Sequence, residues 1–159
     1  MLEEYAHGLY HVLVMSTPAS LPISFALHTY LVTIAPNGSI DRFDVFHSKT
    51  LHGTARRVGY VYHNALPPEE GLRTLHGVPS PRFSTRVIGV CSGAAGSVAC
   101  ALHDVVGGSL DSYPYTDHYA FYPGPNSNTY VQWRINQVPD CTIQLPWNAF
   151  GKGFSPALQ

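Results

Sequence analysis

The sequence carries little charge. Only 12% of its 159 residues are charged, and the formal net charge is -1. Proteins that bind nucleic acid or anionic membranes need clustered positive charge, and the only adjacent basic pair is Arg56 and Arg57. We therefore expect no nucleic acid and no membrane among the partners. The apolar content of 45% indicates a globular fold and excludes a disordered chain.

Cysteine is also scarce. The three cysteines, Cys91, Cys100 and Cys141, cannot all pair, and no two have the C-x-x-C spacing of a metal site. A reduced intracellular protein is therefore expected. Glu3 and Glu4 stand where a secretory signal would carry positive charge, so the expected location is the cytoplasm.

Long apolar runs and metal-binding motifs are absent too. The apolar stretch 9–27 is interrupted by His11, Pro18 and Pro22, which makes it a poor membrane span. Nine histidines are many for this length. His7 and His11 would share a helix face, but the others are scattered and no H-x-H or H-E-x-x-H motif occurs. We expect neither a metal nor another cofactor.

The length suits one domain, 1–159, because no repeat or linker divides the chain. We expect its core at about 25–154, after an N-terminal extension over 1–24. Residues 25–34, FALHTYLVTI, are apolar on both alternating faces and predict a central strand. The Asn-Gly pair that follows predicts a hairpin to a strand at 40–47. Two further strands are expected, at 58–63 and 85–91.

Two helices complete the predicted fold. Residues 94–106 have apolar positions at helical spacing, with Ser92 as the expected N-cap and a Gly-Gly stop. A second helix is expected to begin near Ser127 or Asn128 and to end before Pro139. These elements predict an α+β fold, an antiparallel sheet with two helices packed against it.

Two connecting segments complete the chain. The segment 64–82 contains four prolines and two glycines, which indicates a long loop of the kind that often carries function. The tail 145–154 is expected to form a short strand and a turn.

The stretch PGPNSNTYVQW, residues 123–133, raises the main functional question. Asn126, Ser127 and Asn128 are all of the types that cap helices, and only one can be the cap. The other side chains, with Thr129, could bind a ligand, since a helix N-terminus offers unpaired N–H groups to an anion or oxyanion. The alternative is a rigid loop whose asparagines satisfy their own backbone.

A histidine in the predicted central strand is the second candidate. His28 shares an alternating face with Tyr30 and Val32, so it is expected to be at least partly buried. It is either a core histidine with one satisfied hydrogen bond or a general acid/base, because imidazole titrates near neutral pH.

Other side chains could contribute to a site. Lys152 lies between two glycines, which suits close approach to a ligand or a flexible tail. Cys91 lies between a strand and a helix, as a nucleophile can, although its apolar surroundings favour a buried thiol. The tyrosines of the stretch 112–124 either line a pocket or only pack: Tyr113, Tyr115, Tyr119 and Tyr122.

Several motifs resemble the mainly bacterial family called domain of unknown function 3750. The family pattern has an early H-T-W/F strand, a Y-P-x-x-x-x-Y segment, W-P-G-P-N-S-N-T-F and a late L-P-P-T-A-I-G-K-D. Here these are His28 to Tyr30, Tyr113 to Tyr119, residues 122–130 and residues 145–153. Tyr122 replaces the family's tryptophan. The resemblance covers about 25–154, and the family implies no activity.

A looser resemblance is to circularly permuted papain-like hydrolases. These have a histidine on an early strand and a nucleophilic cysteine that opens a later helix. Aligning the threonines places Asn128 at the cysteine position, and an amide cannot attack as a thiolate does. Ser127 could replace it only if its hydroxyl faces His28.

Three functions follow from these features, and we favour the first. It is an enzyme acting on a small molecule by hydration, elimination, isomerisation or cyclisation, with His28 as acid/base and the turn from Asn126 to Thr129 as the binder of substrate or oxyanion. Second is a non-catalytic binding module on a degenerate hydrolase scaffold, and third an acyl-transfer hydrolase with Ser127 or Cys91 as nucleophile. The oligomeric state stays open. The expected site comprises His28, Asn128 and Ser127 for catalysis, and Asn126, Thr129, Tyr30, Tyr115, Tyr119 and Lys152 for binding.

Overall fold

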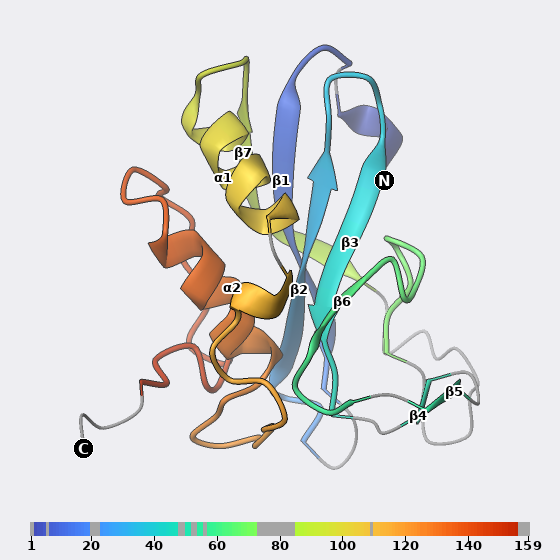
Figure 1. The fold of residues 1–159 in the computed structure, drawn as a ribbon, viewed down its shortest axis with the longest axis vertical. Coiled ribbons are helices and arrows are strands. Elements are labelled where there is room, and N and C mark those ends of the chain that lie inside the picture. Colours follow the sequence, from blue (N-terminus) through green and yellow to red (C-terminus); the bar gives the residue numbers. More distant parts are fainter. Residues whose placement is uncertain are drawn as a thin grey trace.

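The computed structural model describes residues 2–5, 7–19, 23–47, 50–51, 54–55, 57–72, 85–108 and 110–155. A five-stranded antiparallel sheet has the strand order β6-β3-β2-β1-β7. Two helices lie on one of its faces (Figure 1). The predicted α+β fold is confirmed. The strands of this sheet are β1 (Tyr10–Pro18), β2 (Leu27–Ile34), β3 (Ile40–Val45), β6 (Val61–His63) and β7 (Arg86–Gly93).

Smaller elements surround this sheet. The strands β4 (Thr50–Leu51) and β5 (Thr54–Ala55) form a separate two-stranded sheet, and η1 (Leu2–Glu4) is a short 3-10 helix near the N-terminus. A further 3-10 helix, η3 (Leu110–Ser112), follows helix α1 (Val98–Gly107), and α2 (Ser127–Asn136) is the second helix.

The sheet is buried on both faces over its central strands. Every residue of β2 is buried, as the continuous apolar pattern of residues 25–34 predicts. Val14, Leu31 and Phe43 point to the helices and form the larger core with them. Leu13, Tyr30 and Val32 point to the other face, where η1 covers them with Leu2. Because side chains alternate along a strand, adjacent residues of β2 belong to different cores.

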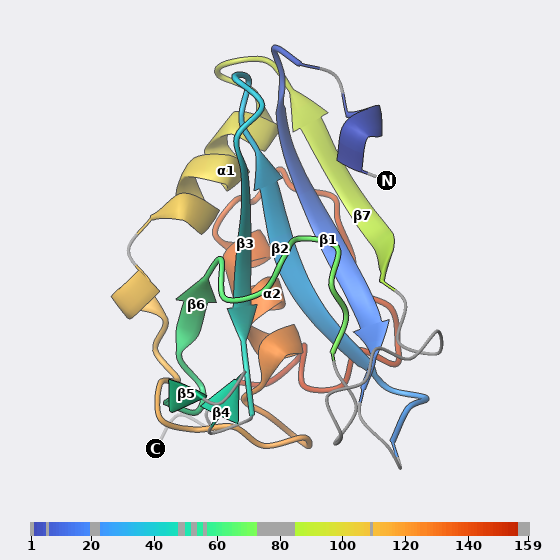
Figure 2. The ribbon, with the colours of Figure 1, turned by 90° about the vertical axis from the view of Figure 1, so that its right-hand side faces the viewer.

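The N-terminal part of the chain differs from our expectation. Residues 1–24 were expected to be an extension, yet β1 lies inside the sheet between β2 and β7 (Figure 2). Residues 11–17 of β1 are all buried. Histidine and proline at its ends made this stretch a poor membrane span, but both are compatible with a nine-residue strand.

The ends of other elements also differ. Helix α1 begins at Val98 with Ser97 as its N-cap, which accepts from Cys100 N at 3.2 Å, and Ser92 instead belongs to β7. A turn at Gly96, with φ of +79°, separates the strand from the helix. The tail 145–154 contains turns and no strand, and β6 is shorter than the predicted strand 58–63. Helix α2 ends before Pro139 as predicted.

Candidate functional site

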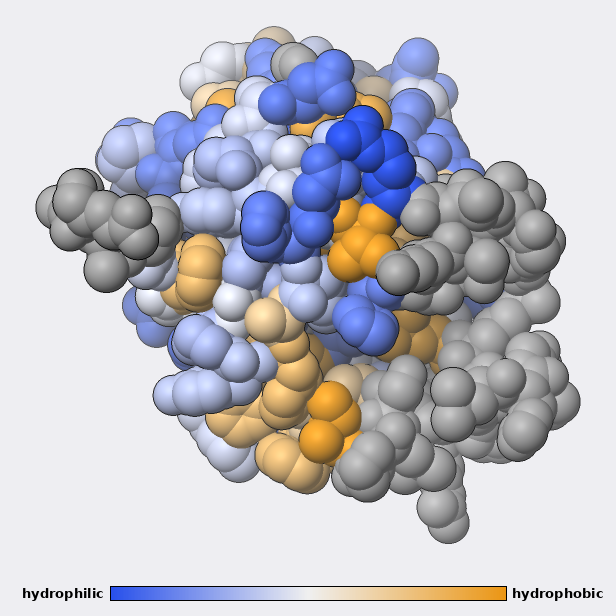
Figure 3. Space-filling view, turned by 60° about the horizontal axis from the view of Figure 1, so that its bottom comes forward, coloured by the Kyte–Doolittle hydropathy of each residue, from blue (hydrophilic) through white to orange (hydrophobic). Residues whose placement is uncertain are grey.

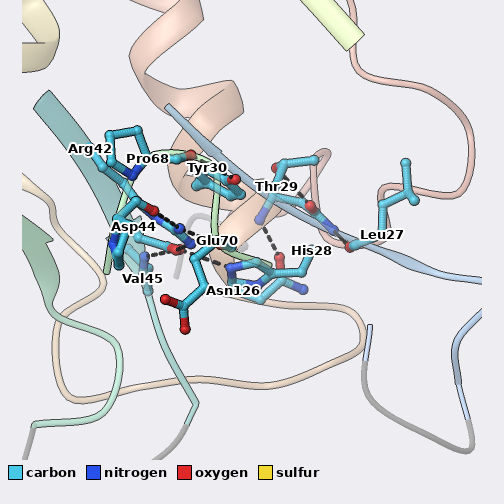
Figure 4. Close-up of polar contacts among 12 residues, drawn as sticks. Leu27, His28, Thr29, Tyr30, Arg42, Asp44, Val45, Pro68, Glu70 and Asn126 are labelled. Atoms are coloured by element: carbon cyan, nitrogen blue, oxygen red, sulfur yellow. Dashed lines mark hydrogen bonds and ion pairs between the residues drawn. The ribbon is translucent and has the colours of Figure 1, made fainter. Parts of the chain in front are cut away.

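Strands β2 and β3 place four polar or aromatic side chains on the face of the sheet that the helices leave free. His28 and Tyr30 are two residues apart in β2, and Arg42 and Asp44 are two residues apart in neighbouring β3. Each pair therefore shares one face. All four side chains are buried, and Figure 4 shows the contacts that they make. We call this group the His28 cluster.

Asp44 is the centre of the His28 cluster. One carboxylate oxygen, Oδ1, lies 2.9 Å from Nε2 of His28, and the other, Oδ2, accepts from Arg42 at 2.7 Å. The backbone N–H of Val45 also donates to Oδ1, at 2.8 Å. The exposed fractions are 4% for His28, 1% for Asp44 and 0% for Arg42. The His28 contact departs from the line of a good hydrogen bond, so the imidazole is close to Asp44 without being fully aligned with it.

The charges around Asp44 keep its carboxylate ionised. Burial by itself would raise the pKa of Asp44, but His28 and Arg42 outweigh that effect by charge and by hydrogen bonding, and the pKa is lowered. A buried carboxylate that stays negative can fix the tautomer and orientation of a neighbouring imidazole. The ring nitrogen of His28 held at Asp44 is Nε2, which leaves Nδ1 for other contacts.

Tyr30 lies beside the ion pair. The guanidinium carbon of Arg42 is 3.6 Å from the centre of the Tyr30 ring, a cation–π arrangement. The phenol donates to the carbonyl of Pro68 at 3.1 Å. Burial is the main cause that raises the pKa of Tyr30 to about 12, so the phenol is a neutral donor at physiological pH.

The segment 66–72 is fastened to the His28 cluster by backbone carbonyls. Arg42 NH1 donates to Pro67 O at 2.8 Å and to Glu70 O at 2.5 Å, in addition to the Tyr30 bond to Pro68. This segment is the first part of the loop expected at 64–82, and residues 73–82 lie outside the described residues. One arginine thus joins Asp44 to the segment next to it.

The N-terminus of α2 is closed by its own residues. The first four N–H groups of a helix lack helical partners, and three N–H groups at the start of α2 donate to side chains of the same turn. Asn126 N donates to Thr129 Oγ1 at 3.0 Å, and Asn128 N and Thr129 N donate to the Asn126 side chain at 2.9 and 3.2 Å. Burial raises the pKa of the neighbouring Tyr119 phenol, and Ser127 opposes that effect by hydrogen bonding. The capping interpretation of PGPNSNT is therefore the one that the geometry supports.

The side chains at this helix start connect three segments. Asn128 accepts from Thr29 Oγ1 at 2.8 Å and donates to Leu27 O at 2.9 Å and Phe150 O at 2.8 Å. Asn126 also donates to Phe150 O, at 3.0 Å. The remaining bonds run from Asn126 to the carbonyls of Ala120 and Phe121 and from Thr129 Oγ1 to Gly151 O. We call these contacts the α2 clasp.

The α2 clasp and the imidazole of His28 lie on opposite faces of the sheet. Thr29 points to the helices and contacts Asn128. His28, its neighbour in the strand, points the other way, with Tyr30. Papain-like chemistry needs the histidine and the start of the helix on one face. The structure therefore does not bring His28 together with Asn128 or Ser127, and the catalytic roles expected for those two residues gain no support.

Other expected binding residues are engaged in packing. The Tyr115 ring contacts Tyr113 and Phe154 edge-on, with centroids 5.5 and 5.2 Å apart. Tyr119 is half-buried and adjoins Ser127. Lys152 Nζ donates to two carbonyls of its own turn, Leu145 O at 2.6 Å and Pro146 O at 3.0 Å.

The cysteine expected as an alternative nucleophile has an ordinary environment. Cys91 is half-buried on β7 and packs against the core on the helix side. Burial, and after it the proximity of Cys141, raises the pKa of the Cys91 thiol. An activated thiol has a lowered pKa, so this environment does not favour a nucleophilic role.

Arg42 and Asp44 were missed by the sequence reasoning. In RFDV, residues 42–45, charged side chains alternate with apolar ones, which is typical of a strand with one face in water. Only the burial of both faces of β3 reveals that Arg42 and Asp44 are interior. The sequence feature that could have indicated their role is their spacing. Charged residues two positions apart share one face of a strand.

The face of the molecule drawn in Figure 3 has apolar surface among polar surface. Three exposed aromatic side chains share one aromatic neighbour and form what we call the aromatic end. Phe25 is 61% exposed, Phe121 39% and Trp147 76%. Their rings each contact Phe150, with centroids 6.0, 5.9 and 6.2 Å apart.

The described part of the chain offers neither a cluster of metal ligands nor a membrane-spanning helix. Its His, Cys, Asp and Glu side chains form no group of three or more that could hold a metal ion. None of the helices described has the length and apolar character needed to cross a membrane.

Comparisons with known proteins give one result. Neither the curated proteins nor the solved structures contain a match to this chain. One family model matches residues 11–154, and it covers β1 to the end of the α2 clasp. Its description is "Protein of unknown function (DUF3750)". Because this match spans most of the sequence and agrees with the PGPNSNT motif, the chain belongs to the DUF3750 family.

Proposed function

We propose that the protein is a small enzyme of proton-transfer chemistry in which His28 is the general acid/base and Asp44 orients it. The observation that carries this proposal is the 2.9 Å contact between His28 Nε2 and a buried carboxylate that Arg42 holds from the other side. A histidine on a central strand is rigidly placed, as a catalytic base must be.

The chemistry uses the two nitrogens of the imidazole differently. Nε2 faces Asp44, which stabilises the imidazolium when the ring is protonated. Nδ1 is then the atom that takes a proton from a small-molecule substrate and returns it. Hydration, elimination, isomerisation and cyclisation all need such a transfer without a covalent intermediate. Tyr30, a neutral phenol on the same face, is the neighbouring hydrogen-bond donor once displacement of the segment 66–72 breaks its bond to Pro68 O.

Access to His28 requires movement of its cover. The imidazole is only 4% exposed, and Phe46 stacks on it with ring centroids 6.1 Å apart. The segment 66–72, held by Arg42, is the element whose displacement would open this face. Apo catalytic contacts often align only when substrate is bound, which accounts for the imperfect direction of the His28 contact.

The test uses hydrogen exchange in small molecules. The protein is incubated in D2O with a panel of carbonyl compounds, hydroxy acids and unsaturated acids, and NMR detects loss of C–H signals. We expect the wild type to exchange at least one compound and His28→Gln to lose that exchange. His11→Gln is the matched control, because His11 is buried at 3% on neighbouring β1. Exchange that survives in His28→Gln would contradict the proposal.

A non-catalytic binding module at the same site is the second candidate. The closed position of His28 and the unaligned contact with Asp44 favour it. In that case, a compound from the panel raises the melting temperature of the wild type but not of Arg42→Lys, and no compound exchanges its protons.

A further inference from the structure

The two edges of the large sheet differ in length. Strand β6 forms one edge with three residues, and β7 forms the other with eight. Figure 2 shows β7 as the outermost strand on its side of the sheet. Within the described ranges, the backbone of β7 pairs with β1 alone. Among the described residues, none pairs with the outer row of N–H and C=O groups of β7, and such a row can pair with another strand.

The sequence of β7 gives this edge little protection. Natural edge strands carry lysine, proline or inward-pointing charge, which prevent pairing with other chains. In RVIGVCSG the only charged residue is Arg86, at the start, and proline is absent. None of the eight residues is buried, and Val90 is 46% exposed. One protecting feature exists, a register shift opposite Val14 and Met15, which leaves the half from Gly89 to Gly93 regular.

We propose that β7 pairs with β7 of a second copy of this chain, antiparallel and about a two-fold axis near Cys91. This arrangement uses the regular half of the strand in both copies. It also separates the only charges: the two Arg86 residues lie roughly 34 Å apart at about 3.4 Å per residue, well beyond the screening length of about 8 Å at physiological salt. Parallel pairing in register would place the two arginines side by side.

Dimerisation pairs the long edge strand β7 and covers its exposed residue Val90. The two sheets become one continuous sheet, whose remaining edges are the short β6 strands. Val90 lies next to Ser92 of the other copy and loses exposed surface. A two-fold pairing is closed, so it does not propagate into filaments. The proposal is independent of the His28 cluster, which lies on β2 and β3, away from β7.

The first test measures oligomeric state. Size-exclusion chromatography with light scattering, run over a range of protein concentrations, is expected to show wild type at twice the monomer mass at high concentration. Val90→Lys places a charge on the edge strand and is expected to weaken dimerisation at least tenfold. The control is Ile40→Lys, at a residue of β3 with 39% exposure, which leaves the dimer unchanged. A wild type that stays monomeric throughout overturns the proposal.

A second measurement locates the interface and remains valid if Val90→Lys does not fold. Amide hydrogen exchange of the wild type is compared at low and high concentration, and the β7 amides that do not pair with β1 are expected to gain protection at high concentration. Protection that is unchanged in β7 overturns the proposal. A dimer that Trp147→Ala dissociates and Val90→Lys leaves intact also overturns it, because the aromatic end would then be the interface.

Discussion

The buried carboxylate of Asp44 connects the side chains of the His28 cluster. It holds the imidazole of His28 and the guanidinium of Arg42, and Arg42 in turn holds the segment 66–72. Removing one partner of a buried pair leaves the other charge without compensation. The stability of this face and its proposed chemistry therefore depend on the same residue.

We predict that Asp44→Asn destabilises the protein by about 3–5 kcal/mol at pH 7, because Arg42 stays buried without its counter-charge. The effect depends on pH. The pKa of Asp44 is lowered in the folded state, so its contribution is complete above the unfolded value of about 3.9 and is lost as pH falls through the folded pKa. Urea unfolding of both proteins at pH 7 and pH 3 measures this, and we expect the difference to shrink at pH 3.

Asp41→Asn is the control for this prediction. Asp41 contacts His63 at 2.6 Å on the partly exposed side of β3, and exposed pairs contribute about 0–1 kcal/mol. A loss as large as that of Asp44→Asn would contradict the importance of burial.

Gly151 is a second residue with a specific requirement. Its φ is +89°, and a Cβ added there would meet the side chain of Asn126. We predict that Gly151→Ala lowers stability by about 2 kcal/mol or more, from strain and from disruption of the cap. Gly153→Ala is the matched control, since open space surrounds it, and thermal unfolding should place it within about 0.5 kcal/mol of wild type.

At the scale of elements, the start of α2 connects the layers of the fold. Asn128 bonds to Leu27 of β2, 101 residues earlier in the sequence, and to Phe150 of the C-terminal turn, 22 residues later. The Asn128 side chain thus links β2 to the C-terminal turn by hydrogen bonds. The density of polar residues in PGPNSNT is explained by these bonds.

We predict that Asn128→Ala lowers stability by about 2–4 kcal/mol, because the buried Thr29 hydroxyl and the Leu27 carbonyl lose this partner, and the Phe150 carbonyl keeps only Asn126. Asn136→Ala, at the exposed end of the same helix, should change stability by less than about 0.5 kcal/mol. Urea unfolding compares the two. If Asn128→Ala is as stable as wild type, the α2 clasp is not structural and a direct role in binding becomes the better explanation.

At the scale of the molecule, the sheet needs its N-terminal strand. Strand β1 pairs with β2 along eight residues and with β7 on its other side, so without it β7 has no neighbour. We predict that a chain beginning at Ile23 does not fold, and that a chain beginning at Gly8, which lacks only η1, does. Circular dichroism distinguishes the two outcomes, and a cooperative thermal transition in the shorter chain would contradict this view of the sheet.

The sequence alone determined a good part of this fold. Residues 25–34 are apolar at every face, the Asn-Gly turn favours a hairpin, and helices end at glycine or before proline. These are local properties, so they predicted β2, β3, β7 and both helices. The capping residues at Asn126 to Asn128 were also recognisable, because a cap is made by residues close in sequence.

Only the tertiary structure decided which side chains meet. That Thr29 and not His28 faces Asn128 depends on which face of β2 the helices cover, and alternation alone does not say which. The interior position of Arg42 depends on the segment 66–72, which is distant in sequence and irregular. Burial is a property of the whole fold. Because β3 is buried, Asp44 lies in the interior beside His28, although its strand has the alternating pattern of a half-exposed strand.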